Sequence, residues 1–455
     1  MLINKTKRAM QNLERLPCLP LRAEQIEFIY SPAEFKQQII HLIRHAQSRI
    51  YITALYWQHD EAGQQILDEI YRAKQANPEL DVKILIDWHR AQRNLLGAEK
   101  SATNADWYCE ERAKYQLPQD PNMFFGVPIN TREVFGVLHI KGFVFDNTVL
   151  YSGASINNVY LNQSGKYRYD RYHKITDKAL TDTLVNFVKN YLLDPSAVSP
   201  LDISNRPKIK DIRQNIRFFR KSLAADAQYH LSASITLNDS LTICPLFGLG
   251  SGNNILNRTI EDLFQLVEQK LVICTPYFNF PRSLQQKIRR LLEKGKQIEI
   301  IVGDKTANDF YIPPSEPFKM AGALPYLYEN NLRRFSKKFE QAITQGRLVV
   351  RTWKDSDNTY HLKGVWVDDR YILLTGNNLN PRAWRLDAEN GLFIHDPKGE
   401  LSEQAQQELT CIRQHTRVLT HYAELEELEQ YPQPVQKLLK KFARLKADKL
   451  VKMIL

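Results

Sequence analysis

The sequence has few cysteines and no long apolar run, and each shortage narrows what the chain can be. Its five cysteines show no Cys-x-x-Cys spacing: Cys18, Cys109, Cys244, Cys274 and Cys411. An odd, unpatterned set predicts reduced thiols in a cytosolic compartment, with neither a disulfide framework nor a zinc site. No segment approaches the ~20 apolar residues that span a bilayer. The N-terminus lacks the apolar core of a secretory signal, so we expect a soluble or peripheral protein.

The charge is strongly positive. The 455 residues carry a formal charge of +11, from 62 basic and 51 acidic residues. This excess predicts a polyanionic partner: an anionic membrane surface, nucleic acid or ribosome bound without sequence preference, or a phosphorylated substrate.

Two segments are candidates for lipid contact. In 433–455, apolar residues recur at helical spacing between lysines, which suits a helix in a lipid interface. A surface helix that packs its apolar stripe on the protein explains this pattern equally well. The apolar segment 123–129 is predicted to be a loop, because Gly126 and Pro128 interrupt it. Burial in the core explains its two phenylalanines better than lipid contact does.

Two copies of the pattern His-x-Lys-x-x-x-x-Asp are the most informative feature present. The copies are His139, Lys141 and Asp146, and then His361, Lys363 and Asp368. Each lies where an apolar run meets a turn and a second apolar run, which predicts a β-hairpin. Side chains alternate along a strand, so each histidine projects from the same face as its lysine. Such a pair is costly in an apolar core and suits a phosphate.

The duplication extends beyond the motifs. Segment 49–57 resembles 270–278, and each is followed by a helix pattern (63–75, 283–294) and a second strand (82–87, 298–304). Strand, helix and strand with short connections predict parallel βαβ units in an α/β protein. We expect an N-terminal domain at 1–200, a joint region at 201–250, a C-terminal domain at 251–432 and a tail helix at 433–455.

Two histidines and two lysines suit the transfer of a phosphodiester. One imidazole attacks phosphorus, while the other protonates the leaving oxygen and then deprotonates the incoming alcohol. The lysines would neutralise the non-bridging phosphate oxygens. We therefore expect neither a metal ion nor a cofactor.

The paired motifs, each followed by a glycine and small polar residues at 153–155 and 376–378, resemble the phospholipase D superfamily across both halves. GASINNVYL, KYRYDRYH and TGNNLNPRAWRLDAENGLFIHDP resemble the phosphatidylserine synthases of Gram-negative bacteria. The resemblance implies two α/β/α domains with mixed sheets about a pseudo-twofold axis, with the catalytic pocket at their seam. It implies phosphatidyl transfer from CDP-diacylglycerol to L-serine through a phosphatidyl-histidine, by an enzyme peripheral to the inner membrane in the cytoplasm.

The resemblance also assigns roles to residues. It makes His139 the nucleophile and His361 the general acid and base. The small polar residue beside the phosphate would be Ser155 or Asn157 in the first half and Asn378 in the second. Asp170 and Glu389 would be the carboxylates that hold the histidines. The motif counts Asp146 and Asp368 as catalytic, although their turn positions suit a capping role at least as well.

Four further residues are candidate substrate contacts. Tyr56 and Tyr277 end matching strands, where open α/β sheets place ligand-binding residues, but they could equally pack in the seam. Arg168 and Arg171 suit a diphosphate or nucleotide, and the alternative is a solvated surface ladder.

Two other functions stay open at this point. One is another activity of the superfamily, such as a nuclease, a phosphodiesterase or a cardiolipin synthase-like enzyme. The other is a non-catalytic basic scaffold that binds membrane or nucleic acid. The sequence does not determine the oligomeric state, so an oligomer is possible.

Overall fold

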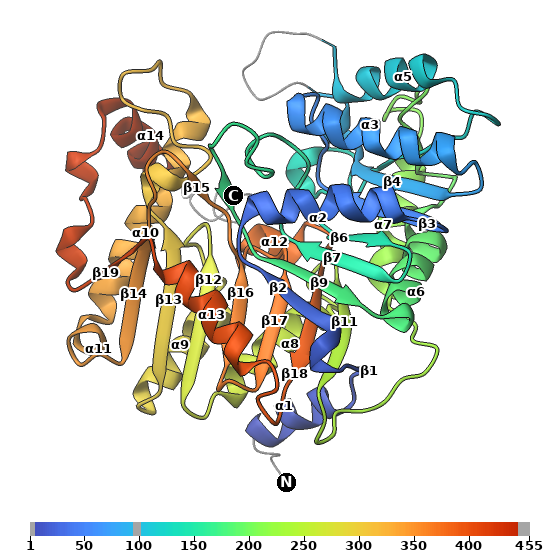
Figure 1. Cartoon of the computed structure of the whole chain (residues 1–455). Coiled ribbons are helices and arrows are strands. Elements are labelled where there is room, and N and C mark those ends of the chain that lie inside the picture. Colours follow the sequence, from blue (N-terminus) through green and yellow to red (C-terminus); the bar gives the residue numbers. More distant parts are fainter. Residues whose placement is uncertain (1–4, 94–101, 445–455) are drawn as a thin grey trace.

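The computed structural model describes residues 5–93 and 102–444, which form two large mixed β-sheets with helices around them (Figure 1). In spatial order, the first sheet consists of β10 (Ser199–Pro200), β5 (Phe124–Val127), β4 (Asp81–Asp87), β3 (Arg49–Ala54), β6 (Gly142–Phe145), β7 (Thr148–Ser152), β9 (Tyr172–Thr176) and β2 (Ile26–Ile29). The second consists of β1 (Leu19–Pro20), β11 (Thr242–Gly248), β18 (Glu389–His395), β17 (Tyr371–Thr375), β16 (Gly364–Val367), β12 (Lys270–Thr275), β13 (Gln297–Gly303), β14 (Leu348–Trp353) and β19 (Thr416–Leu419). A short parallel ladder joins β8 (Arg168–Tyr169) to β15 (Thr359–Tyr360).

The α-helices lie on both sides of these sheets. They are α1 (Lys5–Glu14), α2 (Pro32–His45), α3 (Glu61–Ala76), α4 (Trp88–Ala91), α5 (Asn104–Tyr115), α6 (Lys178–Phe187), α7 (Arg213–Asp226), α8 (Ile255–Leu266), α9 (Arg282–Glu293), α10 (Leu324–Lys338), α11 (Glu340–Thr344), α12 (Pro381–Arg385), α13 (Ser402–Arg413) and α14 (Gln433–Arg444). Helices α2 and α3 pack on one side of the first sheet, and α8 and α9 pack on one side of the second.

The predicted α/β architecture with two similar halves is confirmed. β3, α3 and β4 form a parallel βαβ unit, as do β12, α9 and β13. Helix α3 begins where the Asp60 carboxylate accepts the N–H of Gly63 (2.9 Å), and Ile66 and Ile70, four residues apart, are buried against the sheet. Both predicted hairpins are present, as β6–β7 and β16–β17.

One apolar core joins the two halves. It contains Val149 and Tyr151 of the first sheet together with Trp366 and Leu374 of the second, and it also receives α6 and α13. Burial of apolar area on this scale is the main favourable term in folding. The shared core therefore fixes the two sheets relative to each other, and with them everything at their seam.

Residues 5–20 pack with the second half, although the sequence placed them in the N-terminal domain. Strand β1 pairs with β11 of the second sheet, and α1 packs on α8, where Asn12 donates to Asp262 (2.9 Å). β11 itself lies within the predicted joint region. Strand pairing therefore places both β1, from the predicted N-terminal domain, and β11, from the predicted joint region, in the second sheet.

The prediction that all cysteines are reduced is wrong, because Cys18 and Cys244 form a disulfide with their Cα atoms 4.2 Å apart. The register pairs Leu19 with Ile243, so the cysteines beside them are directly opposite on neighbouring antiparallel strands. The two lie 226 positions apart in the sequence. No local spacing marks such a pair.

The segment predicted as a loop at 123–129 contains strand β5, which pairs in parallel with β4. Phe124 is fully buried, as expected. A Cβ at position 126 would lie 2.5 Å from the Trp88 ring and 2.8 Å from Leu201. Gly126 is therefore required by close packing and does not mark a break in the strand.

Helix α14 packs its apolar stripe on the protein. Val435 and Leu439 are buried against Ala323, Tyr326 and Tyr431. The sequence allowed either a helix in a lipid interface or a surface helix packed on the protein. Residues 433–442 pack on the protein, whereas 445–455 lie outside the described residues. Within the described part of the chain, no helix is long and apolar enough to cross a membrane.

The motif aspartates have a structural role. Asp146, at a left-handed turn (φ 49°), accepts the backbone N–H groups of Gln47, Ser48 and Arg49 (2.7–3.0 Å). Asp368 does the same for residues 268–270, before β12. Asp146 is five residues from Lys141 along the strand direction, or about 16 Å at 3.3 Å per residue. The catalytic role that the motif suggested for both aspartates is therefore corrected to capping.

Asp146→Ala should lower the free energy of unfolding by about 1–2 kcal/mol, because three N–H groups lose their acceptor. Chemical denaturation measures this change. Asp211→Ala is the control: this exposed carboxylate has no side-chain hydrogen bond within the described residues, so the change should stay within about 0.5 kcal/mol. Folded Asp146→Ala protein that no longer binds anions at the histidines would contradict a purely structural role.

Candidate active site

Each motif is held by a strand of the other half. The N–H of His139 donates to the carbonyl of Ala388 (2.9 Å), and that of Lys141 donates to the Asn390 side chain (2.8 Å). In the mirrored arrangement, β15 pairs with β8 and the N–H of His361 donates to the carbonyl of Tyr169 (2.8 Å). This exchange of strands brings both motifs to the seam between the sheets.

The carboxylates are exchanged in the same way. His139 Nδ1 lies 2.9 Å from Glu389 Oε2, and His361 Nδ1 lies 2.9 Å from Asp170 Oδ2, each at hydrogen-bond distance. All four side chains are buried. Bonds at Nδ1 orient each ring and leave Nε2 for chemistry. The sequence identified both carboxylates, but nothing in it showed that each serves the histidine of the other half.

The two lysines and two histidines form one electrostatic cluster. Burial and the charge of Lys363 lower the pKa of Lys141 to about 7, and burial lowers that of Lys363 to about 8. Burial, the two lysines and His361 hold the pKa of His139 well below its usual value. Burial and Lys363 lower the pKa of His361 to about 4. Four groups that can each carry a positive charge therefore share a buried space, and a bound anion would favour their charged forms.

The carboxylates beside the two histidines differ. Burial, followed by the charge of Asp387, raises the pKa of Glu389 well above its usual value. Burial alone would raise the pKa of Asp170, but Lys363 and His361 outweigh it and lower the pKa. Lys363 Nζ lies 3.3 Å from Asp170 Oδ2 and also contacts the His361 ring. The similar halves thus give the two imidazoles unequal surroundings.

The glycine after each hairpin leaves room for these groups. A Cβ on Gly376 would lie 2.9 Å from Lys141 Cγ and 3.5 Å from His139 Nδ1. A Cβ on Gly153 would lie 2.6 Å from the Asp170 carboxylate. The small residues of the motif are therefore explained by close approach of the opposing catalytic groups.

The predicted small polar residues divide into two kinds. Asn157 accepts the N–H of Tyr160 (3.0 Å), a capping bond like that of Asn380 to Ala383 (2.9 Å). Ser155 is buried. Among the described residues, Asn378 Oδ1 and Glu389 Oε1 are buried without a hydrogen-bond partner, as a ligand site requires.

A cluster of aromatic and charged side chains lies beside His361. Tyr277 and Arg168, both predicted, meet there at Asp309: the tyrosine hydroxyl donates to Oδ1 (2.6 Å) and the guanidinium is 3.6 Å from Oδ2. The hydroxyl of Tyr160 is 2.9 Å from His361 Nδ1. Sequence reasoning missed Tyr160 and Asp309, although Asp309 follows the matching strand β13, where ligand-contacting residues are expected.

Tyr56 lies on the first-half side of this cluster. Its hydroxyl accepts from Arg168 (3.5 Å) and from Asn157 (3.4 Å), and the guanidinium of Arg90 is 4.9 Å from its ring centroid. Tyr56 therefore lies at the site and does not merely pack in the seam.

Arg171 is not available to a substrate. Its guanidinium is buried, makes two hydrogen bonds of 2.7 Å with Glu408 of α13, and donates to the carbonyl of Leu373 (3.0 Å). It also lies 4.0 Å from the Trp366 ring centroid. The guanidinium thus links this first-half residue to the second half, and these contacts favour a structural brace over the predicted substrate-binding role of Arg171.

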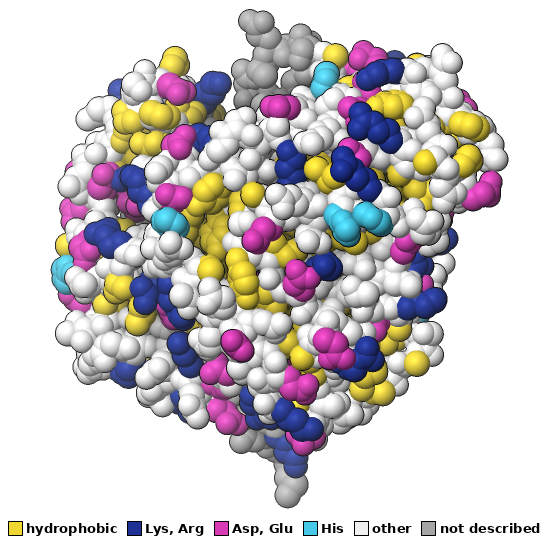
Figure 2. All heavy atoms as spheres, in the orientation of Figure 1, with side chains coloured by type: hydrophobic (Ala, Val, Ile, Leu, Met, Phe, Trp, Pro, Cys, Tyr) yellow, Lys and Arg dark blue, Asp and Glu magenta, His cyan; other side chains and the backbone are white. Residues whose placement is uncertain are grey.

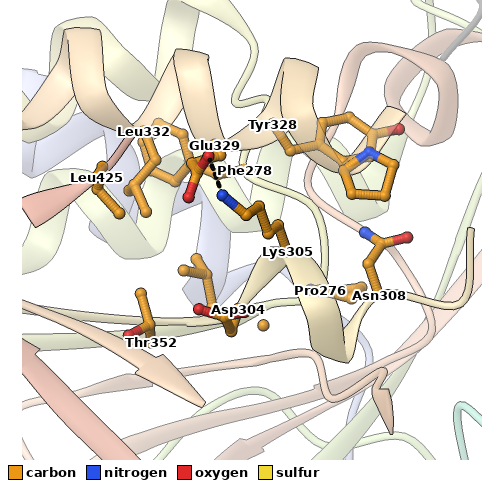
Figure 3. Close-up of a pocket in the computed structure, with 13 residues that line it drawn as sticks. Pro276, Phe278, Asp304, Lys305, Asn308, Tyr328, Glu329, Leu332, Thr352 and Leu425 are labelled. Atoms are coloured by element: carbon orange, nitrogen blue, oxygen red, sulfur yellow. Dashed lines mark hydrogen bonds and ion pairs between the residues drawn. The ribbon is translucent and has the colours of Figure 1, made fainter. Parts of the chain in front are cut away.

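A separate small cavity lies beside β13 and α10 (Figure 3). It holds ≈ 20 Å³, about enough for one water. Its polar lining includes Lys305, which pairs with Glu329 (3.1 Å). Neither histidine motif lines it. Within the described residues, no group of three or more His, Cys, Asp or Glu side chains could hold a metal ion.

Comparison with known proteins places the chain in a family. A family model described as "Cardiolipin synthase, PLD-like domain" matches residues 39–189 and 260–412. The chain is 74% identical to the CDP-diacylglycerol–serine O-phosphatidyltransferase of Haemophilus influenzae, with 100% of both chains covered, and 51% identical to that of Escherichia coli, with 99% of both covered. The crystal structure of the H. influenzae phosphatidylserine synthase matches with a TM-score of 0.97 at 73% identity, covering 99% of this chain and 100% of that one.

The chain therefore belongs to the phospholipase D superfamily and, within it, to the family of these CDP-diacylglycerol–serine O-phosphatidyltransferases.

Anion binding should weaken as pH rises through 7 to 8. An anion favours charged Lys141 and Lys363, whose pKa values of about 7 and 8 mean that both are protonated below this range and neutral above it. Above it, binding must take up protons, which costs affinity up to about tenfold per pH unit for each proton. Sulfate keeps a constant charge here, so calorimetric titration from pH 6 to 9 measures the effect. Affinity independent of pH would contradict the assignment.

Proposed function

We propose that this protein transfers the phosphatidyl group of CDP-diacylglycerol to the hydroxyl of L-serine and releases CMP. Two relatives that are named for this reaction support the proposal, because the similarity covers nearly the whole length of each of them. Within the molecule, the observation that carries it is the reciprocal holding of two imidazoles, by Glu389 and Asp170, around a cluster of buried cations.

The pair divides the chemistry as follows. His139 is neutral at physiological pH because its pKa is held low, and its free Nε2 attacks phosphorus. A P–N bond forms, the P–O bond to CMP breaks, and His361 delivers a proton to the leaving oxygen. In the second half-reaction, His361 takes the proton of the serine hydroxyl, the serine oxygen bonds to phosphorus, and the P–N electron pair returns to His139.

The unequal carboxylates support this assignment of roles. Burial and Lys363 lower the pKa of His361 to about 4, so this ring too is neutral at physiological pH before substrate binds. The ionised Asp170 opposes that shift and favours the protonated ring that a general acid needs. The negative charge of the bound diphosphate acts in the same direction. Lys141 and Lys363 neutralise the non-bridging oxygens. No step requires a metal ion or cofactor.

His139→Ala should abolish both CMP release and covalent labelling of the protein by CDP-diacylglycerol radiolabelled in its lipid. His361→Ala should slow turnover on the order of 100- to 10,000-fold while some labelled adduct still accumulates. Gels of samples quenched in detergent at alkaline pH, where the P–N bond survives, measure the adduct, and Asp355→Asn, outside the site, is the control. Equal adduct in the two histidine variants would overturn the assignment.

The same assay separates the alternative functions. CMP release that requires serine supports the synthase, and release to water alone indicates a phosphodiesterase of the superfamily. Protein that releases no CMP would be a scaffold.

We further propose that the protein binds the anionic cytoplasmic surface of the inner membrane peripherally, where its lipid substrate lies. Exposed Lys437, Lys440 and Lys441 of α14 adjoin the 3₁₀ helix Met320–Ala323, and Met320 is 70% exposed. Hydrophobic atoms lie at the surface over this region, at the upper left of Figure 2. Lysines beside exposed apolar side chains suit a lipid interface. On the face shown, basic and acidic side chains are otherwise interspersed, which gives less support to nucleic acid or ribosome binding.

Replacing Lys437, Lys440 and Lys441 by glutamine should weaken binding to phosphatidylglycerol vesicles on the order of 10- to 100-fold at low salt, since each lysine near such a surface contributes about 1 kcal/mol. The difference should shrink in high salt. Vesicle sedimentation measures it. A variant with Lys7, Lys294 and Lys398 replaced loses the same charge from other exposed positions and should bind almost normally. Equal loss in both variants would show that only net charge matters.

A further inference from the structure

Arg168 and Asp309 form a long ion pair in the cluster beside His361. Arg168 Nη1 and Asp309 Oδ2 are 3.6 Å apart, which is beyond a hydrogen bond. Their side chains are 15% and 19% exposed, so neither is completely enclosed. Opposite charges held at this separation complement the two ends of a zwitterion.

Each member of this pair is held in place by other bonds. The Tyr277 hydroxyl donates to Asp309 Oδ1 (2.6 Å) and leaves Oδ2 for a second donor. Arg168 Nε donates to Thr359 (3.2 Å), two residues before His361, and its guanidinium lies 5.0 Å from the Tyr160 ring centroid. Within the described residues, Arg168 Nη2 makes no hydrogen bond. The pair is thus positioned in advance and retains unused capacity on both members.

The Arg168–Asp309 pair also lies beside His361, the histidine that acts on the acceptor. Tyr160, which contacts Arg168, bonds to His361, and the Tyr277 ring centroid is 6.2 Å from that of His361. The charge of Arg168 contributes to lowering the pKa of His361, after burial and Lys363. His361 is the group that must receive the acceptor's hydroxyl proton.

The two similar halves differ at this point. Tyr277 has the carboxylate of Asp309 as its partner, whereas the matching Tyr56 has the guanidinium of Arg90 over its ring. Of the two tyrosines, only Tyr277 donates its hydroxyl to a carboxylate within the described residues. Duplication supplied equivalent tyrosines, and the charges beside them have diverged.

We infer that Asp309 and Arg168 form the receptor for the amino-acid acceptor, Asp309 binding its α-ammonium and Arg168 its α-carboxylate. This inference rests on the proposed function. With both groups held, the side-chain hydroxyl is directed toward His361. Leaving and entering groups occupy the same side of the phosphorus, so Arg168 serves the phosphate of CMP first and the carboxylate of serine afterwards.

Such a receptor explains selection of serine over water and glycerol. An acceptor without charges offers neither group the shorter charged contact that serine offers, and sites built around polar groups discriminate against analogues that lack the matching groups. Tyr277 is a positioning residue here, because it acts through Asp309.

The test compares three acceptors on CDP-diacylglycerol: L-serine, 3-hydroxypropanoate, which lacks the ammonium, and ethanolamine, which lacks the carboxylate. Asp309→Asn should lower kcat/KM for serine on the order of 10- to 100-fold and leave 3-hydroxypropanoate within about threefold. Arg168→Gln should lower kcat/KM for serine by a similar factor and leave kcat/KM for ethanolamine within about threefold. Tyr277→Phe should shift selectivity in the direction of Asp309→Asn, but less.

Asp355→Asn is the matched control. This aspartate also accepts a tyrosine hydroxyl, from Tyr167 (2.5 Å), but it lies outside the histidine cluster. Its variant should keep all three acceptors within about twofold of the parent. Formation of the labelled phosphatidyl-enzyme, which needs no acceptor, reports that each variant retains an intact site.

If Asp309→Asn lowers kcat/KM for serine and for 3-hydroxypropanoate by the same factor, the receptor inference is overturned, since a structural defect predicts that result. A parent protein that never releases CMP in response to serine would instead refute the proposed function, so the two failures are distinguishable.

Discussion

The active site depends on a crossed arrangement in which each half completes the motif of the other. His139 is held by the backbone of Ala388 and the carboxylate of Glu389, and His361 by the backbone of Tyr169 and the carboxylate of Asp170. Each motif histidine thus takes its carboxylate from the other half. The shared core between the sheets keeps these crossed contacts in register, so folding and chemistry depend on the same interface.

This arrangement has an electrostatic cost. Lys141 and Lys363 are buried close to two imidazoles, and their depressed pKa values show that the empty site disfavours its own charges. In such a site, a bound phosphate diester supplies the charge that water supplies elsewhere. The shared core and the Arg171–Glu408 brace offset this cost at a distance from the chemistry.

Much of this could be predicted from the sequence because it repeats within the chain. The twofold histidine–lysine pattern and the βαβ units follow from local patterns, whereas Glu389 and Asp170 were indicated only by the family resemblance. Local patterns say nothing about which surface a side chain meets across the fold. Arg168 and Arg171 look alike in the sequence, yet one lies at the site and the other is saturated by Glu408. Likewise, Cys18 meets Cys244 only through strand pairing, and Gly126 is needed only because Trp88 and Leu201 lie above it. Asp309 carries no motif at all and becomes visible only as the partner of Tyr277.

Because each half holds the motif histidine of the other, the two halves cannot change independently in evolution. A substitution that shifts β8 displaces both Asp170 and the strand beneath His361, so its effect is felt in the opposite repeat. Compensation must arise there too, hundreds of positions away in the gene. The two copies therefore depend on each other, and losing or replacing either one alone would remove the carboxylate that holds the motif histidine of the other.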